Sequence, residues 1–195
     1  MRINYNLWET NLRSFNEEID GELIINMHPS MGYYGDYLSA EIVVKHFKVG
    51  TQLQIIQSAT RYNDEVSIAL LSFEYSYSNK HNLFLSVNLR DFFDKLFLGK
   101  RILSGNTIFD KKYMINSSNK SLALNLFCDT KVQEMVANNP CLVFNISTAD
   151  NMTKVMMKYT EKDKLYSEEE LRKLYDDFGY VLSSIKKTIE LAEKA

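Results

Sequence analysis

The segment EVSIALLSFEYSY, residues 65–77, alternates apolar and polar side chains with a period of two, which is typical of a β-strand. Its apolar residues follow one parity from Val66 and the other parity from Phe73. Because a shift of one residue turns every side chain to the opposite face, we predict a change of register at Leu70 and Leu71. A β-bulge at this point, or burial of both faces, would explain the pattern.

Other segments with the same period lie on both sides of this strand, separated by short polar turns. They are AEIVVKHFKV (40–49), TQLQIIQSA (51–59) and NLFLSVN (82–88). We therefore predict four antiparallel strands in sequence. A further short strand is predicted for ELIINMH (22–28), which ends before Pro29.

The second half of the chain has a different arrangement, which is strand, helix, strand, strand, helix. We predict a strand over 107–116 and then a helix over Asn119–Asn138 that breaks near Cys128 and Asp129. The next two strands are CLVFNIS (141–147) and KVMMKY (154–159).

Amphipathic helices are predicted near both ends of the chain. The first covers residues 7–20, with apolar side chains at helical spacing and Gly21 as its C-terminal cap. The second begins with a capping box formed by Ser167 and Glu170. Its apolar stripe comprises Leu171, Leu174, Phe178, Leu182, Ile185 and Ile189. We expect this stripe to cover a sheet, with a dimer interface as the alternative.

These elements predict an α+β fold, with a largely antiparallel sheet covered by an N-terminal helix, a middle helix and a long C-terminal helix. The chain of 195 residues is long enough to bury a core without disulfides or metals. LGKRILSG (98–105) joins a strand-rich half (1–100) to the second half (101–195) and is too short and apolar for a flexible linker. We therefore predict a single domain over 1–195.

The composition limits the classes of partner and compartment. The net charge is −2 and the lysines are spread in ones and twos, so no basic patch for a nucleic acid stands out. No apolar run approaches the ~20 residues of a membrane-spanning helix, and the polar start MRINYNLWETN does not resemble a signal peptide. We expect a reduced, cytoplasmic protein without a bound cofactor.

The candidate ligand-binding residues are Tyr33, Tyr34 and Tyr37, in the loop GYYGDY (32–37). Tyrosines bury a large area at small entropic cost and provide a polar tip, which suits a recognition surface. The alternative is a loop folded onto the sheet.

No catalytic or metal-ligating residues are predicted. The histidines His28, His46 and His81 are widely separated, and the motifs that cradle phosphate or present a nucleophile do not occur. Cys128 and Cys141 have apolar neighbours in the sequence, so we expect both thiols to lie in the core.

Asp110 stands out within the strand predicted over 107–116. We interpret it as architectural: a solvated or salt-bridged carboxylate, or one that accepts backbone N–H groups of the preceding turn, Ser104 to Thr107. A catalytic aspartate would need a partner base, acid or metal, and none lies nearby in the sequence.

The region around Asp110 follows the pattern G-[DN]-x-x-F-D-x-x-[FY]-x-[VI]. The matching residues are Gly105, Asn106, Phe109, Asp110, Tyr113 and Ile115. With the SLALNLF helix, the two-strand hairpin and the final helix, they resemble a bacterial domain family of unknown function over residues 83–193. The resemblance implies a fold and no activity, and it carries over no catalytic residues.

Two functions are compatible with these observations. The first is a non-enzymatic intracellular binding or interaction protein that self-associates or binds a protein partner. The alternative is a small-molecule-binding protein or hydrolase-like enzyme, whose site assembles from distant Asp, His and Tyr residues. Convergent titratable groups in a pocket would favour the alternative, whereas an exposed apolar patch would favour the first.

Overall fold

The structure is a computed structural model that describes residues 3–29, 35–45, 47, 52–79, 82–90, 102–139 and 142–193. It is an α+β fold with a large antiparallel sheet, an N-terminal helix and a long C-terminal helix, which confirms the predicted fold class. The chain forms two compact units. Unit 1 comprises Met1–Tyr75 and Lys158–Phe178, and unit 2 comprises Ser76–Met157 and Gly179–Ala195.

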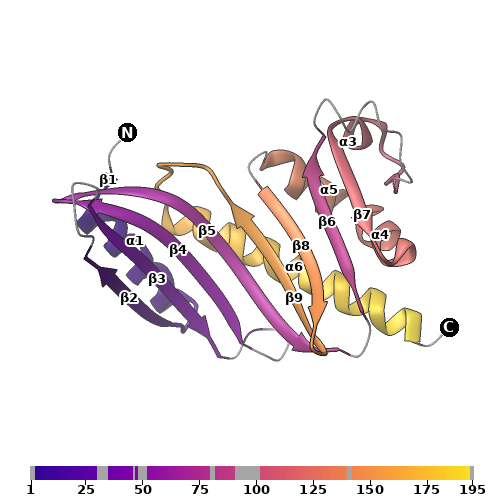
Figure 1. Ribbon diagram of the computed structural model, residues 1–195, viewed down its shortest axis with the longest axis horizontal. Helices are drawn as coiled ribbons and strands as arrows, with labels where there is room; N and C mark the ends of the chain where they lie inside the picture. The colour runs from indigo at the N-terminus through magenta and orange to yellow at the C-terminus, as the bar shows by residue number, and fades with distance from the viewer. Residues whose placement is uncertain are drawn as a thin grey trace. The chain divides into compact units, whose positions relative to one another are not determined.

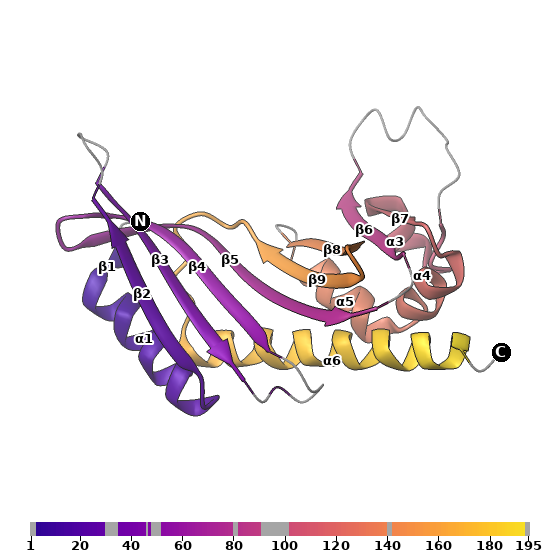
Figure 2. The ribbon, with the colours of Figure 1, turned by 60° about the horizontal axis from the view of Figure 1, so that its bottom comes forward.

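Unit 1 is built on four neighbouring strands with a helix on one face (Figures 1 and 2). Its elements are β1 (Ile3–Asn4), α1 (Tyr5–Glu18), β2 (Glu22–His28), β3 (Asp36–Val44), β4 (Leu53–Tyr62) and most of β5 (Glu65–Ser78). The strands lie in the order β2-β3-β4-β5, and β1 pairs with β5. All of these pairings are antiparallel.

The register between β4 and β5 changes close to the predicted point. Ser58 lies opposite Leu70, whereas Ala59 lies opposite Ile68, so Ala69 is an extra residue in β5. This arrangement is a β-bulge, which is one of the two explanations given for the sequence pattern. It lies one residue before Leu70 and Leu71, where the change was predicted. Apolar residues of β5 on both sides of the bulge are consequently buried.

Helix α1 supplies the core of unit 1 with Trp8, Leu12 and Phe15, which are all buried. The indole N–H of Trp8 donates a hydrogen bond of 2.7 Å to Oε1 of Gln57, so that both buried polar groups have a partner. Leu7, the first residue of the predicted helix, is 50% exposed.

Helix α1 begins and ends two residues before the predicted range of 7–20, and the predicted cap Gly21 is not the residue in the left-handed conformation. Asp20, with φ of 52°, adopts the left-handed conformation, and the Gly21 N–H donates to the Asn16 carbonyl at 3.0 Å. Gly21 is needed for a different reason. A Cβ at this position would lie 2.7 Å from both Asn16 Oδ1 and Ile42 Cγ2, so the side-chain-free residue allows the chain to turn against β3.

Unit 2 combines a hairpin-containing sheet with short helices. Its elements are β6 (Phe84–Leu89), α3 (Thr107–Lys112), β7 (Tyr113–Ser117), α4 (Lys120–Phe127), α5 (Thr130–Asn138), β8 (Leu142–Ala149) and most of β9 (Met152–Tyr159). The strands lie in the order β9-β8-β6-β7. Asp150 and Asn151, both with positive φ, form the two-residue turn of the predicted hairpin.

Strand β6 corrects the prediction of four antiparallel strands in sequence. It pairs with β7 and β8 rather than with β5, so the series of sequential strands ends at β5. The alternation of side chains identified the strand but contains no information about its neighbour, which is why this part of the prediction was wrong.

Residues 107–112 form α3 instead of the predicted strand. The Asn106 side chain accepts the N–H groups of Ile108 and Phe109 at 3.0 and 3.2 Å, and it thereby caps one and a half turns of helix. The strand begins only at Tyr113. Phe109 and Tyr113 are nevertheless both buried and stacked, with ring centroids 4.8 Å apart.

The predicted middle helix is present and is interrupted where expected. It consists of α4 and α5, separated by Cys128 and Asp129. Asp129 caps α5, because its Oδ1 accepts the Lys131 N–H at 2.9 Å.

The last helix, α6 (Glu168–Glu193), begins with the predicted capping box. The Ser167 N–H donates to Glu170 Oε2 at 2.9 Å, and the Glu170 N–H donates to Ser167 Oγ at 3.2 Å. The predicted apolar stripe is buried from Leu171 to Ile185. Within unit 1, the Phe178 ring lies 5.8 Å from the Phe73 ring of β5.

The boundaries between the two units fall within β5, β9 and α6. The chain therefore crosses from one unit to the other in regular secondary structure and not in loops. Because each unit boundary lies inside a hydrogen-bonded element, unfolding of one unit alone would break backbone hydrogen bonds within all three elements, and we expect the chain to unfold as one cooperative domain. A thermal melt followed by circular dichroism and by calorimetry should show a single transition. Two well-separated transitions would contradict the prediction of one domain.

Phe178→Ala should lower the free energy of unfolding by about 3 to 5 kcal/mol, because it leaves a cavity where a fully buried aromatic ring now packs. Lys173→Ala on the exposed face of the same helix is the matched control and should change it by less than about 0.5 kcal/mol. Urea denaturation measures both values. Equal losses in the two variants would show that the buried face of α6 is wrongly assigned.

Candidate functional site

The outer edge of unit 1 is the strand β2, which pairs with β3 along all seven of its residues (Figure 1). Among the described residues, no strand pairs with its other side. Every second residue of an antiparallel strand directs its N–H and C=O away from the neighbour, so β2 presents a row of backbone donors and acceptors at this edge.

The side chains of β2 do little to protect this edge. Ile24 is 40% exposed and Met27 is 51% exposed, while Leu23 and Ile25 are half-buried. The ionisable residues stand only at the two ends, as Glu22 and His28. Natural edge strands are usually blocked by a central charge, a proline or a bulge, and β2 has none of these.

A second surface feature is a polar groove in unit 2 with a volume of about 430 Å³, in the range of small-molecule sites. It lies between the α4–α5 junction and α6. The lining residues of the polar groove are Asn125, Asp129, Tyr180, Ser183, Ser184, Lys187 and Thr188. The α6 residues among them recur at intervals of three and four, which places them on one helix face.

A hydrogen bond between Tyr180 and Asp129 fixes one wall of the groove. The Tyr180 hydroxyl donates to Oδ2 of Asp129 at 2.6 Å, and Lys131 Nζ lies 4.0 Å from the Tyr180 ring centroid. The bond to Asp129 raises the pKa of Tyr180, because ionisation would remove the donated proton and set two negative charges side by side. Tyr180 therefore acts as a neutral hydroxyl near neutral pH.

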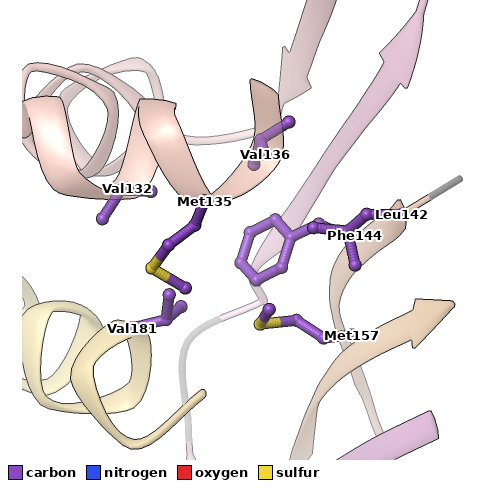
Figure 3. Close-up of a pocket in the computed structure, with 7 residues that line it drawn as sticks. All are labelled: Val132, Met135, Val136, Leu142, Phe144, Met157 and Val181. Atoms are coloured by element: carbon purple, nitrogen blue, oxygen red, sulfur yellow. The ribbon is translucent and has the colours of Figure 1, made fainter. Parts of the chain in front are cut away.

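Unit 2 also contains an apolar hollow beneath α5, shown in Figure 3. The side chains of Met135, Phe144, Met157 and Val181 converge on it. Its volume is about 10 Å³, which corresponds to one water molecule at most. It is a small packing defect of the core and not a ligand site.

The predicted tyrosine site is only partly described. Tyr33 and Tyr34 lie outside the described residues, so their part in binding stays a prediction. Tyr37, at the start of β3, is 46% exposed and donates a hydrogen bond of 3.1 Å to Ser58 Oγ. Its ring stacks with that of His28 of β2 at 6.2 Å between centroids.

Asp110 lies in α3, where its Oδ1 accepts the Ser104 N–H at 2.8 Å. This is one of the architectural roles predicted for it, a carboxylate that accepts a backbone N–H of the preceding turn. The predicted placement of Asp110 in a strand is wrong, because residues 107–112 are helical.

Other titratable groups do not assemble into a metal site within the described parts of the chain. His46, His81 and Cys141 lie outside those parts. Cys128 is exposed, which contradicts the prediction of a core thiol. It follows the last turn of α4, where the chain must leave the core to enter α5.

The described helices include none that is both long and apolar enough to cross a membrane. The expectations of a cytoplasmic location and of no cofactor remain predictions.

Sequence analysis did not identify the polar groove. Asp129 was noted only as part of a helix break. The sequence of α6 does contain a signal that could have indicated the groove. Tyr180, Ser183 and Ser184 all carry hydroxyl groups and lie on one face of the helix. The partner Asp129 is 51 positions away, and nothing local to either residue links them.

Comparisons with protein-family models, curated proteins and solved structures found no match for this chain. The resemblance of residues 83–193 to a bacterial domain family therefore stays a prediction.

Asp110→Ala should lower the free energy of unfolding by about 0.5 to 2 kcal/mol, because the Ser104 N–H loses its acceptor. Asp110→Asn should cost less, since its amide oxygen can still accept this bond. Chemical denaturation of both variants tests the order. An unchanged stability in Asp110→Ala would refute the architectural role.

Proposed function

We propose that the protein is a non-enzymatic, cytoplasmic interaction protein that self-associates by pairing the open edge of β2 with the same strand of a second copy. The observation that supports this proposal is the exposed and uncharged middle of β2, where Asn26 is the one polar residue and Ile24 and Met27 are the most exposed apolar side chains. An edge of this kind favours pairing with another strand.

The sequence of β2 is suited to antiparallel pairing with itself. When the two-fold axis passes through Ile25, all seven residues find a partner, and Glu22 comes opposite the partner's His28. Leu23 then comes opposite the partner's Met27, which joins two apolar side chains across the strands. Such an isologous contact closes after two copies and does not produce a fibre.

The expected association is weak and depends on concentration. A seven-residue strand buries a small area, at the low end of specific interfaces, so affinity has to come mainly from backbone hydrogen bonds and a few apolar contacts. Glu22 is already paired with Lys45 at 2.8 Å, and both groups are largely exposed, so the contact with His28 would contribute to register more than to affinity.

The second candidate function is the binding of a small molecule in the polar groove. Asp129 converges there with Tyr180 and Lys187 of α6, and titratable groups that meet in one pocket favour the alternative function. No described histidine lines this groove, so the support extends to a binding site and not to a hydrolase.

Self-association can be tested with Ile24→Lys. The wild-type protein should shift from monomer to dimer with rising concentration in analytical ultracentrifugation. Ile24→Lys places an ammonium group in the middle of the new sheet and should weaken dimerisation at least about tenfold, equivalent to about 1.4 kcal/mol.

The matched control is Leu7→Lys, which changes a similarly exposed aliphatic side chain on α1, away from the edge. It should dimerise like the wild type. A wild-type protein that stays monomeric throughout, or equal weakening by both substitutions, would overturn the proposed role of β2.

A further inference from the structure

The hydroxyl groups that line the polar groove have already used their protons within the protein. Ser183 Oγ donates to the Gly179 carbonyl at 2.9 Å, and Thr188 Oγ1 donates to the Ser184 carbonyl at 2.9 Å. Tyr180 donates to Asp129, and its oxygen already accepts a hydrogen bond from the Ser184 side chain. A hydroxyl has one proton and two lone pairs, so the remaining capacity of these oxygens is to accept hydrogen bonds. The groove therefore requires a ligand that provides several donors.

The charges of the groove restrict the ligand further. Asp129 places a carboxylate in the groove. Both carboxylate oxygens already accept hydrogen bonds, one from the Lys131 N–H and one from the Tyr180 hydroxyl. The Lys131 ammonium lies over the Tyr180 ring and offsets this negative charge. Lys187 is exposed and forms no ion pair with any described side chain. The balance favours an anion and disfavours a ligand whose donors are ammonium groups.

We propose that the polar groove binds a small anion rich in hydroxyl groups, of the class that includes sugar acids and sugar phosphates. The ligand hydroxyls donate to the oxygens of Ser183 and Thr188, and the anionic group binds the Lys187 ammonium. Lys187 is four residues beyond Ser183 and seven beyond Tyr180 on α6, so the anion and the hydroxyls lie along one helix face. The exposed amide of Asn125 supplies a further donor from α4.

This assignment gives a ligand class to the second candidate function and does not depend on self-association. The groove lies wholly in unit 2, whereas β2 belongs to unit 1. Substitution of Lys187, in the part of α6 that belongs to unit 2, therefore leaves the β2 edge unchanged, and the two proposals are measured separately.

Four six-carbon compounds separate the two requirements of the groove. Gluconate carries both hydroxyls and a carboxylate, sorbitol carries only hydroxyls, and hexanoate carries only the carboxylate. Glucose 6-phosphate tests whether the anionic group is a phosphate. Isothermal titration calorimetry should show binding of gluconate or glucose 6-phosphate, with sorbitol and hexanoate at least about tenfold weaker.

Lys187→Met should weaken binding of the better anion at least about tenfold, because it removes the one lysine among the described residues that line the groove. Lys186→Met is the matched control, since Lys186 is the exposed neighbour on the same helix and does not line the groove. It should bind like the wild type. Both positions are at the surface, and circular dichroism verifies that the variants are folded.

Three results would overturn the proposal. They are no binding of either anionic polyol to the folded wild-type protein, equal affinity for sorbitol or hexanoate, and equal losses in the two lysine variants. Preference for gluconate or for glucose 6-phosphate supports the proposal in either case and identifies the anionic group.

Discussion

The β-bulge at Ala69 allows one buried face to extend along the whole of β5. A strand alternates its side chains strictly, so without the extra residue either Val66 and Ile68 or Leu71 and Phe73 would face water. Exposing two such side chains would cost about 3 to 6 kcal/mol, a large part of the stability of an ordinary domain. The packing of α1 and of the first part of α6 in unit 1 requires the continuous apolar face that the bulge provides.

The last helix shows how one element can serve the core and the surface together. Val181 and Ile185 are buried, whereas Ser183 and Lys187 belong to the polar groove. Because successive residues of a helix are rotated by about 100°, these two sets lie on different faces of α6. The apolar hollow beneath α5 is therefore almost filled by side chains, while the polar groove stays open to water.

The two proposed functions use different physical features and are compatible. The β2 edge presents backbone groups with which no described strand pairs, and it has exposed apolar side chains, which suit a protein strand. The polar groove presents acceptor oxygens and a lysine without a described acidic partner, which suit a small polar anion. One protein could therefore self-associate through the β2 edge and bind a small molecule in the polar groove, because neither contact alters the other region.

The sequence by itself determined the features that depend on neighbours within a few residues. The capping box of Ser167 and Glu170, the break at Asp129 and the alternation of β5 were predicted for this reason, since each rests on local hydrogen bonds or on one element's own periodicity. The helix α3 was the local exception, because the cap formed by Asn106 outweighed an apparent alternation.

Only the tertiary structure decided which elements meet. The burial of whole faces decides which strands pair, which strand lies at an edge and which residues line a groove. The local sequence around a residue does not indicate its distant partner. For this reason the pairing of β6 with β7 and β8 could not be predicted, and neither could the open side of β2. The contact between Asp129 and Tyr180 arises because the stripe of α6 is buried in the core, and this burial brings its hydroxyl-bearing face beside the α4–α5 junction.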